Sequence, residues 1–375
     1  MVSLARQSLL YDWRRFVAAI LTLAFSGLLM LIQVGLLLGQ LDSFTLPIRR
    51  ARADLWVTAP NVSSWEQSTI VAARNEGRFW AHPAVLDVQE MGLGQGEWRT
   101  GDGKRQSVMV IGVGVQQGSL SEMEGFAPET LAILARPDTV VIDRTDAEKL
   151  GARVGSTAEI SGIKVTIGGF VRSFRSNVMP LVFASQATLR HLNQDWSGYG
   201  PPYFLLKLDP QFDRESVRDD LKSNGGTQAY DIAEPNELIF RSAQFWLEES
   251  GSGTSFAFSM LLAMFVGIGV TSQTLRGAIT ASLKEYAALR ALGIEVARLR
   301  GIVLEQSLWV ALAGIVLMAV AAAALAALAW TAGIPLSLPW WISLPTALFV
   351  ALIAGMSGLL SLSVLYRSEP ADLLR

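Results

Sequence analysis

The amino-acid sequence predicts an α-helical membrane protein with four transmembrane helices and a large extracytoplasmic α+β domain inserted between helices 1 and 2. Its 375 residues are 51% hydrophobic and only 17% charged, whereas about 25% of the residues of a soluble protein are charged. Long uncharged runs lie near both ends of the chain, and the region between them is acidic and contains strand-like patterns. These observations predict a membrane part and a globular part.

The uncharged runs define the predicted spans. Phe16–Leu41 is long enough for one span of about 20 apolar residues. Ser250–Leu275 is the second uncharged run. Gln306–Tyr366 is too long for a single span and has Gly and Pro residues in its middle, so it predicts two spans, near residues 304–331 and 342–366.

These spans divide the chain into three predicted parts. Residues 1–41 form the N-terminal segment and the first transmembrane helix. Residues 42–254 form the extracytoplasmic α+β domain with a helical stalk. Residues 255–375 contain transmembrane helices 2–4, with a cytoplasmic coupling connector over residues 276–303.

The orientation is predicted from Lys and Arg residues in the short flanks of the spans. Basic residues precede the first span, fill the connector and follow the last span, which predicts that both termini and the connector are cytoplasmic. Arg49, Arg50 and Arg52 oppose this assignment, but they begin a long translocated domain, where the rule has little force.

The region between the first two spans reads as α+β. Alternating or β-branched runs predict strands at 54–58, 107–113, 139–142, 158–160, 164–167 and 203–208. Helical patterns cover 145–150, 185–192 and 214–222. The Gly-rich segment 92–103 is predicted to be a loop. The amphipathic segment Asn236–Glu249 is predicted to be a helical stalk that continues the second span, with an interfacial helix on the bilayer as the alternative.

The residue types exclude several kinds of chemistry. The chain has no cysteine and two histidines, so we expect no disulfide, no Cys nucleophile and no His-rich metal site. Gly101–Arg105 lacks the glycine spacing and the hydroxyl residue of a phosphate-binding loop. We therefore expect no catalytic, metal or cofactor site in this chain. No basic cluster indicates nucleic acid.

The connector carries the sharpest functional pattern. Residues 282–292 favour a helix, and Gly293 is placed to end it in the left-handed conformation. Leu289, Leu292 and Ile294 are apolar side chains on a short cytoplasmic element, which indicates a partner groove. The residues predicted to contact a partner are Glu285, Leu289, Arg290, Leu292, Gly293, Ile294 and Glu295.

Five segments together resemble the permease subunits of MacB-type (type VII) ABC transporters. Glu285–Gly293 resembles the family's Glu-rich stretch that ends in a "(K/R)ALG" motif, and Glu305 matches the Glu that opens its third span. Pro370–Arg375 resembles the family's "P-x-x-x-L-R" tail. In the outer region, Val140–Asp143 and Leu150–Ser156 resemble its strand, helix and "LG-x-x-VG" signature. The DevC/HrtB-like branch of the family is the one that the chain resembles in its length, in the absence of a fused ATPase and in the segment Asp54–Val57.

The resemblance implies a homodimer in the bacterial inner membrane, with a periplasmic outer domain and two copies of an ABC ATPase that bind ATP and Mg. It implies mechanotransmission, in which ATPase closure moves the connector and the motion expels substrate from the periplasm or the outer leaflet. A periplasmic adaptor, an outer-membrane channel and membrane lipid are the further partners implied. The alternatives are an FtsX-like signalling subunit that activates an extracytoplasmic hydrolase, and LolC/LolE-like lipoprotein release. The substrate is not indicated.

Overall fold

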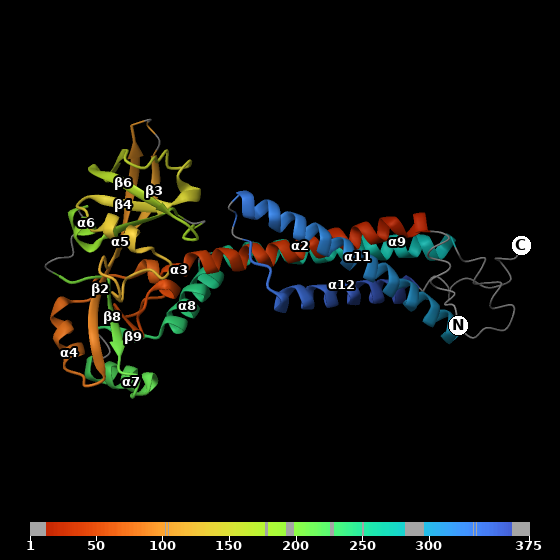
Figure 1. Ribbon diagram of the computed structural model, residues 1–375. Coiled ribbons are helices and arrows are strands. Elements are labelled where there is room, and N and C mark those ends of the chain that lie inside the picture. The colour runs from red at the N-terminus through yellow and green to blue at the C-terminus, as the bar shows by residue number, and fades with distance from the viewer. Residues whose placement is uncertain are drawn as a thin grey trace, which may run out of the picture. The chain divides into compact units, whose positions relative to one another are not determined.

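The computed structural model describes residues 13–101, 103, 105–176, 179–192, 199–225, 229–249, 251–281, 296–332, 334 and 336–361. The chain forms two compact units (Figure 1). One, here called the outer domain, comprises Gln40–Gly253. The other, here called the helical unit, comprises Met1–Gly39 and Thr254–Arg375.

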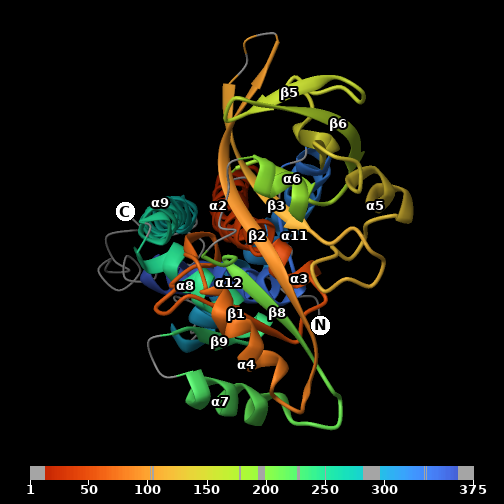
Figure 2. The ribbon, with the colours of Figure 1, turned by 90° about the vertical axis from the view of Figure 1, so that its left-hand side faces the viewer.

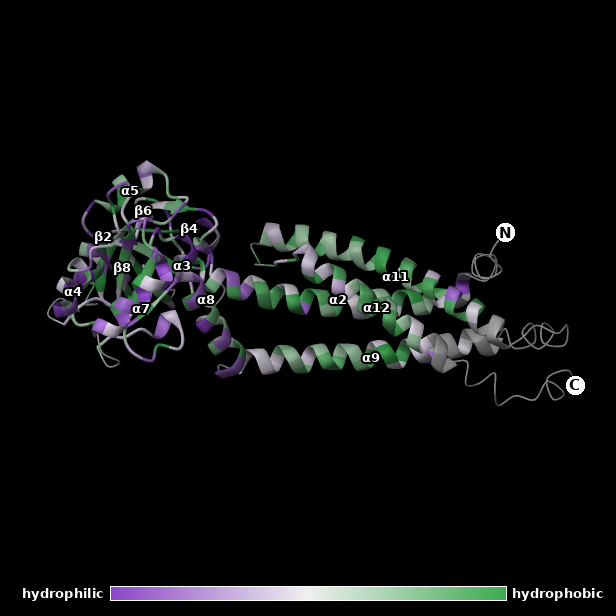
Figure 3. Cartoon of the chain, turned by 90° about the horizontal axis from the view of Figure 1, so that it is seen from below, coloured by the Kyte–Doolittle hydropathy of each residue, from purple (hydrophilic) through white to green (hydrophobic). Residues whose placement is uncertain are grey.

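Long apolar helices make up the helical unit. They are α2 (Trp13–Phe44), α9 (Ser252–Ala281), α11 (Val296–Ala332) and α12 (Trp340–Ser361). Among the described residues, four stretches are long and apolar enough to cross a membrane, namely Phe16–Phe44, Gly253–Val270, Gly301–Ala332 and Trp340–Ser357. Figure 3 shows that hydrophobic residues dominate these helices. The predicted fold class, with four spans and a large domain between the first two, is confirmed.

Small residues let the helices of this unit approach closely. A Cβ at Gly27 in α2 would lie 2.6 Å from Met318 Sδ in α11 and 2.7 Å from Val350 Cγ2 in α12, so glycine lets these helices approach closely. Gly35 lies against the segment between α11 and α12, where Ser337 N donates a hydrogen bond of 3.0 Å to Gly35 O. Large apolar side chains such as Trp330, which is 86% exposed, cover the outside of the unit, as a lipid environment requires.

In the described part of the outer domain, nine strands form the sheet. They are β1 (Leu55–Thr58), β2 (Val85–Thr100), β3 (Arg105–Val113), β4 (Thr139–Asp143), β5 (Thr157–Ile160), β6 (Ile163–Val171), β7 (Leu181–Ser185), β8 (Tyr203–Leu208) and β9 (Asp231–Ala233). The described helices around them are α3 (Leu46–Arg50), α4 (Glu76–Trp80), α5 (Pro128–Leu134), α6 (Gln186–His191), α7 (Arg214–Gly225) and α8 (Pro235–Gln244). Short helical turns are η1 (Trp65–Gln67), η2 (Ala73–Asn75), η3 (Arg144–Asp146) and η4 (Phe245–Glu249).

The first lobe of the outer domain is an antiparallel sheet in the order β2–β8–β1–β9. Helix α4 connects β1 to β2, and α7 connects β8 to β9, which is the split βαβ arrangement of ferredoxin-like folds. Both faces are buried, because Leu55 and Val57 pack on the side of α4 and α7, whereas Trp56 packs on the side of α3 and α8.

The second lobe is a closed ring of strands inserted between β2 and β8. Its pairings run β2–β3–β7–β4–β6–β5 and return to β2. Residues alternate along β3, with Val108 and Val110 inside the ring and Met109 and Ile111 outside it. The long strand β2 belongs to both lobes (Figure 2), so the sheet of one lobe continues into the other.

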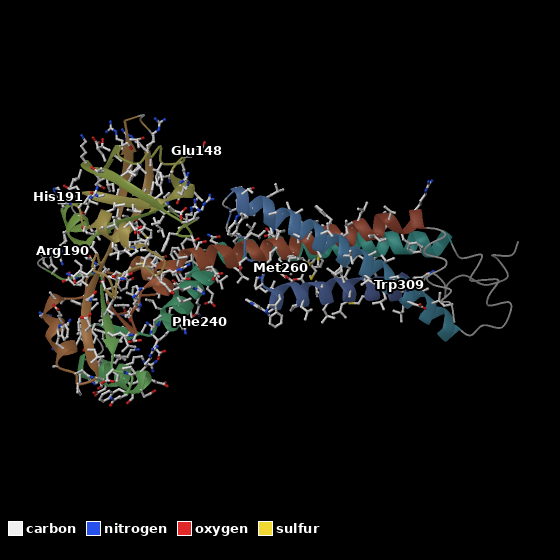
Figure 4. The ribbon with its side chains drawn as sticks, viewed as in Figure 1. Glu148, Arg190, His191, Phe240, Met260 and Trp309 are labelled. Atoms are coloured by element: carbon white, nitrogen blue, oxygen red, sulfur yellow. The ribbon has the colours of Figure 1, made fainter. Side chains whose placement is uncertain are left out.

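Contacts from α6 hold the two lobes together. Gln186 Nε2 donates hydrogen bonds to Glu90 O at 2.8 Å and Gly112 O at 3.0 Å. Arg190, labelled in Figure 4, pairs with the carboxylate of Glu90. One short helix therefore fixes β2 against β3 where β2 leaves the ring.

Most of the predicted strands are confirmed, and three predictions for other segments are wrong. Segment 92–103 is largely strand, because β2 extends to Thr100. A Cβ at Gly96 would lie 2.7 Å from Ile160 Cγ2, so glycine here permits close packing and does not mark a loop. Segment 145–150 contains only the end of the turn η3. The segment 236–249 is helical, but Gly251, with φ +75°, separates it from α9.

Candidate functional site

The predicted ATPase-coupling residues lie outside the described part of the chain. They are Glu285, Leu289, Arg290, Leu292, Gly293, Ile294 and Glu295. The helices on either side are described, since α9 extends to Ala281 and α11 begins at Val296. The coupling role of these residues stays a prediction.

The structure shows a second candidate site where the first span enters the outer domain. Phe44 is the last residue of α2, and the indole of Trp65 in η1 is fully buried against it. We call the set Phe44, Trp65, Glu66, Tyr203, Ser242 and Trp246 the Trp65 clamp. It joins the end of α2, the sheet and the helix that precedes the second span.

Trp65 is the centre of the clamp because each of its three polar groups forms a hydrogen bond to a different element. Its Nε1 donates to Phe44 O at 3.0 Å, and its backbone N–H donates to Ser242 Oγ in α8 at 3.1 Å. Tyr203 in β8 donates its hydroxyl proton to Trp65 O. A buried residue with bonds in three directions fixes those elements relative to one another.

Aromatic contacts extend the clamp to η4. The rings of Phe44 and Trp65 have centroids 5.8 Å apart, and those of Phe44 and Trp246 are 4.9 Å apart at 65°. Trp246 Nε1 also donates to Glu66 Oε1 at 3.0 Å. Edge-to-face aromatic pairs of this kind stabilise beyond their buried area, so the end of the first span and the approach to the second share one packed cluster.

Burial shifts the pKa values of two ionisable side chains in the clamp, Glu66 and Tyr203. Burial raises the pKa of the Glu66 carboxyl, while hydrogen bonds from Ser64 and Trp246 oppose that rise. Burial also raises the pKa of Tyr203, whose hydroxyl therefore stays a proton donor.

Three arginines anchor the chain just beyond the first span. Arg49 Nη2 lies 3.0 Å from Asp42 Oδ1, and Arg52 Nη2 lies 3.4 Å from Glu122 Oε1. Arg50 donates to Glu124 O at 3.2 Å. These are the basic residues that opposed the predicted orientation, and their bonds to the outer domain give them a structural role.

Sequence reasoning missed the Trp65 clamp. The sequence predicts an amphipathic stalk over Asn236–Glu249, but nothing in it marks Phe44 or Trp65 as partners of that segment. The only local signal is a lone tryptophan in a polar stretch, Asn61–Thr69. Within the described residues, no group of three or more His, Cys, Asp or Glu side chains could hold a metal ion.

Comparisons with known proteins cover most of the chain. Residues 16–224 match the family model described as the MacB-like periplasmic core domain. Residues 257–370 match the FtsX-like permease C-terminal model. No curated protein matches the chain.

Three solved structures are similar to the chain. The periplasmic region of MacB from Actinobacillus actinomycetemcomitans is 15% identical, with 50% of this chain and 92% of that one covered and a TM-score of 0.35. The extracellular domain of the noncanonic ABC-type transporter YknZ from Gram-positive bacteria is 13% identical, with coverages of 48% and 100% and a TM-score of 0.32. A domain of a putative permease protein from Porphyromonas gingivalis is 16% identical, with coverages of 51% and 97% and a TM-score of 0.33.

The two family models match in the order that the spans and the outer domain require. The first match alone extends over more than half of the sequence. The chain therefore belongs to the MacB-type, FtsX-like family of ABC transporter permeases.

Proposed function

We propose that the chain is the permease subunit of an ATP-driven exporter that works by mechanotransmission and belongs to the DevC/HrtB-like branch. It forms a homodimer in the bacterial inner membrane, with both termini in the cytoplasm, and it binds two copies of a separate ABC ATPase. A periplasmic adaptor and an outer-membrane channel complete the assembly. The ATPase, not this chain, binds ATP and Mg.

The proposed cycle begins at the connector. ATP closes the ATPase dimer, which moves residues 276–303 through contacts at Leu289, Leu292 and Ile294. The spans carry this motion to the outer domain, which then expels substrate from the periplasm or the outer leaflet. The uncharged runs of the spans support this cycle, because ion-coupled carriers use an ionisable residue inside the membrane.

The observation that carries the proposal is the Trp65 clamp. Phe44 ends the first span, and Ser242 and Trp246 lie shortly before the second. Phe44 and Ser242 are hydrogen-bonded to Trp65, and Trp246 is hydrogen-bonded to Glu66. Tyr203 joins Trp65 to the central strand β8. Motion of α2 would therefore reach the sheet through Phe44 and Trp65, and the helical segment that ends before Gly251 is held on the same cluster.

The clamp is tested with a reporter that needs no known substrate. The cysteine-free chain receives Gln117→Cys for a fluorophore on the outer domain and is reconstituted with its ATPase. The double variant Trp65→Phe/Trp246→Phe replaces each indole by a smaller phenyl ring and so loses both indole donors, at about 1 kcal/mol for each hydrogen bond. We expect ATP hydrolysis to continue while the ATP-dependent fluorescence change falls by at least half.

The matched control for the clamp is Trp80→Phe. Trp80 is 48% exposed and its indole donates to Glu76, so this variant loses one indole donor outside the clamp. It should respond to ATP as the wild type does. A full response in the double variant would contradict a mechanical role for the clamp.

The connector is tested with Leu292→Asp and, separately, Glu295→Lys. Each should leave the protein folded and dimeric while the fluorescence change no longer follows ATP hydrolysis. A normal response in both variants would remove the connector assignment.

The partners separate this proposal from its alternatives. Purification of the chain from its host in mild detergent should recover an ABC ATPase and a periplasmic adaptor. An ATPase with a cell-wall hydrolase would support FtsX-like signalling, and a second, different permease chain would support LolC/LolE-like lipoprotein release. Recovery of no ATPase would contradict all three.

A further inference from the structure

The segment between the first span and the sheet contacts both lobes of the outer domain. Its two ends are held on the first lobe, because Phe44 belongs to the Trp65 clamp and Asp54 N donates to Leu206 O of β8 at 2.9 Å. Between these ends, Arg50 and Arg52 are bonded to the second lobe. Helix α3, which ends at Arg50, lies where the two lobes meet (Figures 1 and 2). The segment therefore connects α2 to each lobe separately.

Arg50 forms a reciprocal pair of hydrogen bonds with a residue of the second lobe. Its Nη1 donates to Glu124 O at 3.2 Å, and its carbonyl oxygen accepts a hydrogen bond from Glu124 N at 2.7 Å. Glu124 lies in the loop between β3 and α5, and α5 packs on β4, β6 and β7. A displacement of Arg50 would therefore reach the strands of the second lobe through this loop and α5.

The guanidinium group of Arg50 also covers an aromatic cluster of the second lobe. Its Cζ lies 5.7 Å from the ring centroid of Phe174, which is a cation–π distance. The ring of Phe174 packs on those of Phe126 and Phe183, with centroids 4.9 Å and 5.2 Å away. Phe183 belongs to β7, and Phe174 N donates to Asp143 Oδ2 at the end of β4. The cluster thus connects Arg50 to two strands of the ring.

Arg52 holds the same loop at a second point. Its backbone N–H donates to Leu120 O at 2.9 Å, and its Nη2 lies 3.4 Å from Glu122 Oε1. The side chain of Glu122 is only 5% exposed, and its Oε2 accepts a hydrogen bond from Gly118 N at 2.6 Å. Loss of the Arg52 cation would leave this buried carboxylate without the ion pair, which is unfavourable. The loop is therefore fastened to the segment by backbone and by side chains.

We propose that Arg50 and Arg52 are positioning residues that carry the motion of the first span to the second lobe. With their partners they form the arginine strap, which consists of Arg50, Arg52, Leu120, Glu122, Glu124 and Phe174. Strand β2 and helix α6 also join the lobes, so a chain without the strap keeps its fold but transmits less of the motion to α5. The inference rests on the proposed function, because it names the route that the motion takes beyond the Trp65 clamp.

The test uses two single-cysteine reporters in the cysteine-free chain, one in each lobe. Gln211→Cys labels the exposed connection between β8 and α7 in the first lobe, and Ala127→Cys labels the exposed residue before α5 in the second. Each labelled chain is reconstituted with its ATPase. In the variant Arg50→Gln/Arg52→Gln, the ATP-dependent fluorescence change at position 127 should fall by at least half. The change at position 211 should persist, because the Trp65 clamp is intact.

Arg49→Gln is the matched control for this variant. Arg49 lies in the same segment, but its Nη2 pairs with Asp42 of α2 at 3.0 Å. Both reporters should respond to ATP in this variant as they do in the wild type. The charge-conserving variant Arg50→Lys/Arg52→Lys keeps a cation beside the Phe174 ring and the Glu122 carboxylate, so it should recover most of the change at position 127.

A second measurement needs no ATPase. Hydrogen–deuterium exchange of the full chain in detergent should be faster over residues 120–126 in Arg50→Gln/Arg52→Gln than in Arg49→Gln, because contacts that cover this loop are lost. Equal exchange in these two variants, or an equal fall at positions 127 and 211, would overturn the proposal.

Two other results of the fluorescence experiment would also count against the strap. An unchanged response at position 127 in Arg50→Gln/Arg52→Gln, or the same loss in the Gln and Lys variants, would overturn the strap alone if position 211 responds in the wild type. A wild type that responds to ATP at neither position would contradict the proposed function and the role of the strap with it.

Discussion

Asp143 and Asp146 are both buried near the end of β4, but their carboxylates differ in how many hydrogen bonds they accept. Asp143 accepts hydrogen bonds from Thr145 N at 2.8 Å, Thr145 Oγ1 at 2.7 Å and Phe174 N at 2.8 Å. Asp146 is 2% exposed, and its Oδ2 has no hydrogen-bond partner among the described residues. Burial raises the pKa of Asp146 from 3.8 to about 6, with Arg175 opposing the rise and Asp143 adding to it.

Asp146 makes stability depend on pH. The folded state holds its proton more tightly than the unfolded state, so this contribution is complete below pH 3.8 and is lost as pH rises through about 6. Asp146→Asn removes the titration. At pH 7.5 it should raise the free energy of unfolding by about 3 kcal/mol, at about 1.4 kcal/mol for each unit of pKa. Denaturant unfolding of the full chain in detergent at pH 5 and pH 7.5 checks this.

Asp143→Asn is the paired control. It replaces one acceptor oxygen by an NH₂ group facing N–H or O–H donors, so it should lower stability at both pH values. A stabilised Asp143 variant, or an unchanged pH dependence in the Asp146 variant, would show that the two carboxylates are not distinguished in this way.

Of the two candidate sites, the connector was predicted from the sequence and the Trp65 clamp was not. The connector residues carry a local pattern, a helix that ends at glycine next to exposed leucines, and such patterns can be recognised without a fold. Trp65 carries none. Its partner Ser242 is 177 residues away and Tyr203 is 138 residues away, so its role follows from sheet pairings that no local window contains.

At the scale of elements, strands with alternating or β-branched residues were predicted, and those with other signals were not. β1 and β8 are apolar on consecutive positions because both faces of their sheet are covered. The glycines in the second half of β2 predict a loop there, which is wrong. Those glycines fit a ring in which neighbouring side chains leave no space for a Cβ, as at Gly96. Composition alone does not separate a flexible glycine from a tightly packed one.

Gly35 in α2 offers a prediction about the packing of the helical unit. A Cβ there would lie 2.5 Å from Leu338 Cδ2 and 3.0 Å from the backbone oxygen of Ser337. Gly35→Ala should therefore displace this segment, strain its hydrogen bond to Gly35 O and cost about 1–3 kcal/mol. A lower thermal midpoint of the full chain in detergent is the expected result.

Gly269→Ala in α9 is the matched control, because nothing lies within 4 Å of a Cβ at that position. Alanine also has a higher helix propensity than glycine, so the thermal unfolding midpoint should stay the same or rise. Similar losses in both variants would mean that the segment between α11 and α12 is not packed on α2.

At the scale of the whole molecule, the sequence predicted the order of spans and outer domain because hydrophobic length is a strong signal. The runs Phe16–Leu41 and Gln306–Tyr366 contain no charged residue. These runs therefore offer few groups that could bind an ion.

The orientation of the chain can be measured because its sequence lacks cysteine. Gln117→Cys places a thiol in an exposed loop of the outer domain, and Ala291→Cys places one in the connector. In spheroplasts, a membrane-impermeant maleimide should label the first variant directly and the second only after permeabilisation. The reverse pattern would place the termini outside the cytoplasm and exclude the proposed ATPase contacts.

The strand order has a consequence for biosynthesis. Within the described residues, β1 pairs with β8 and β9, which follow it by about 150 residues or more along the chain, and β2 pairs with β8 as well. A strand that emerges early must wait for late partners, and such non-local pairing slows folding. Trp56 has no strand partner until Leu205 of β8 has been synthesised, and its second neighbour, Ala233 of β9, follows later still. This interval exposes an apolar strand edge, so a chaperone would protect the chain most at this stage.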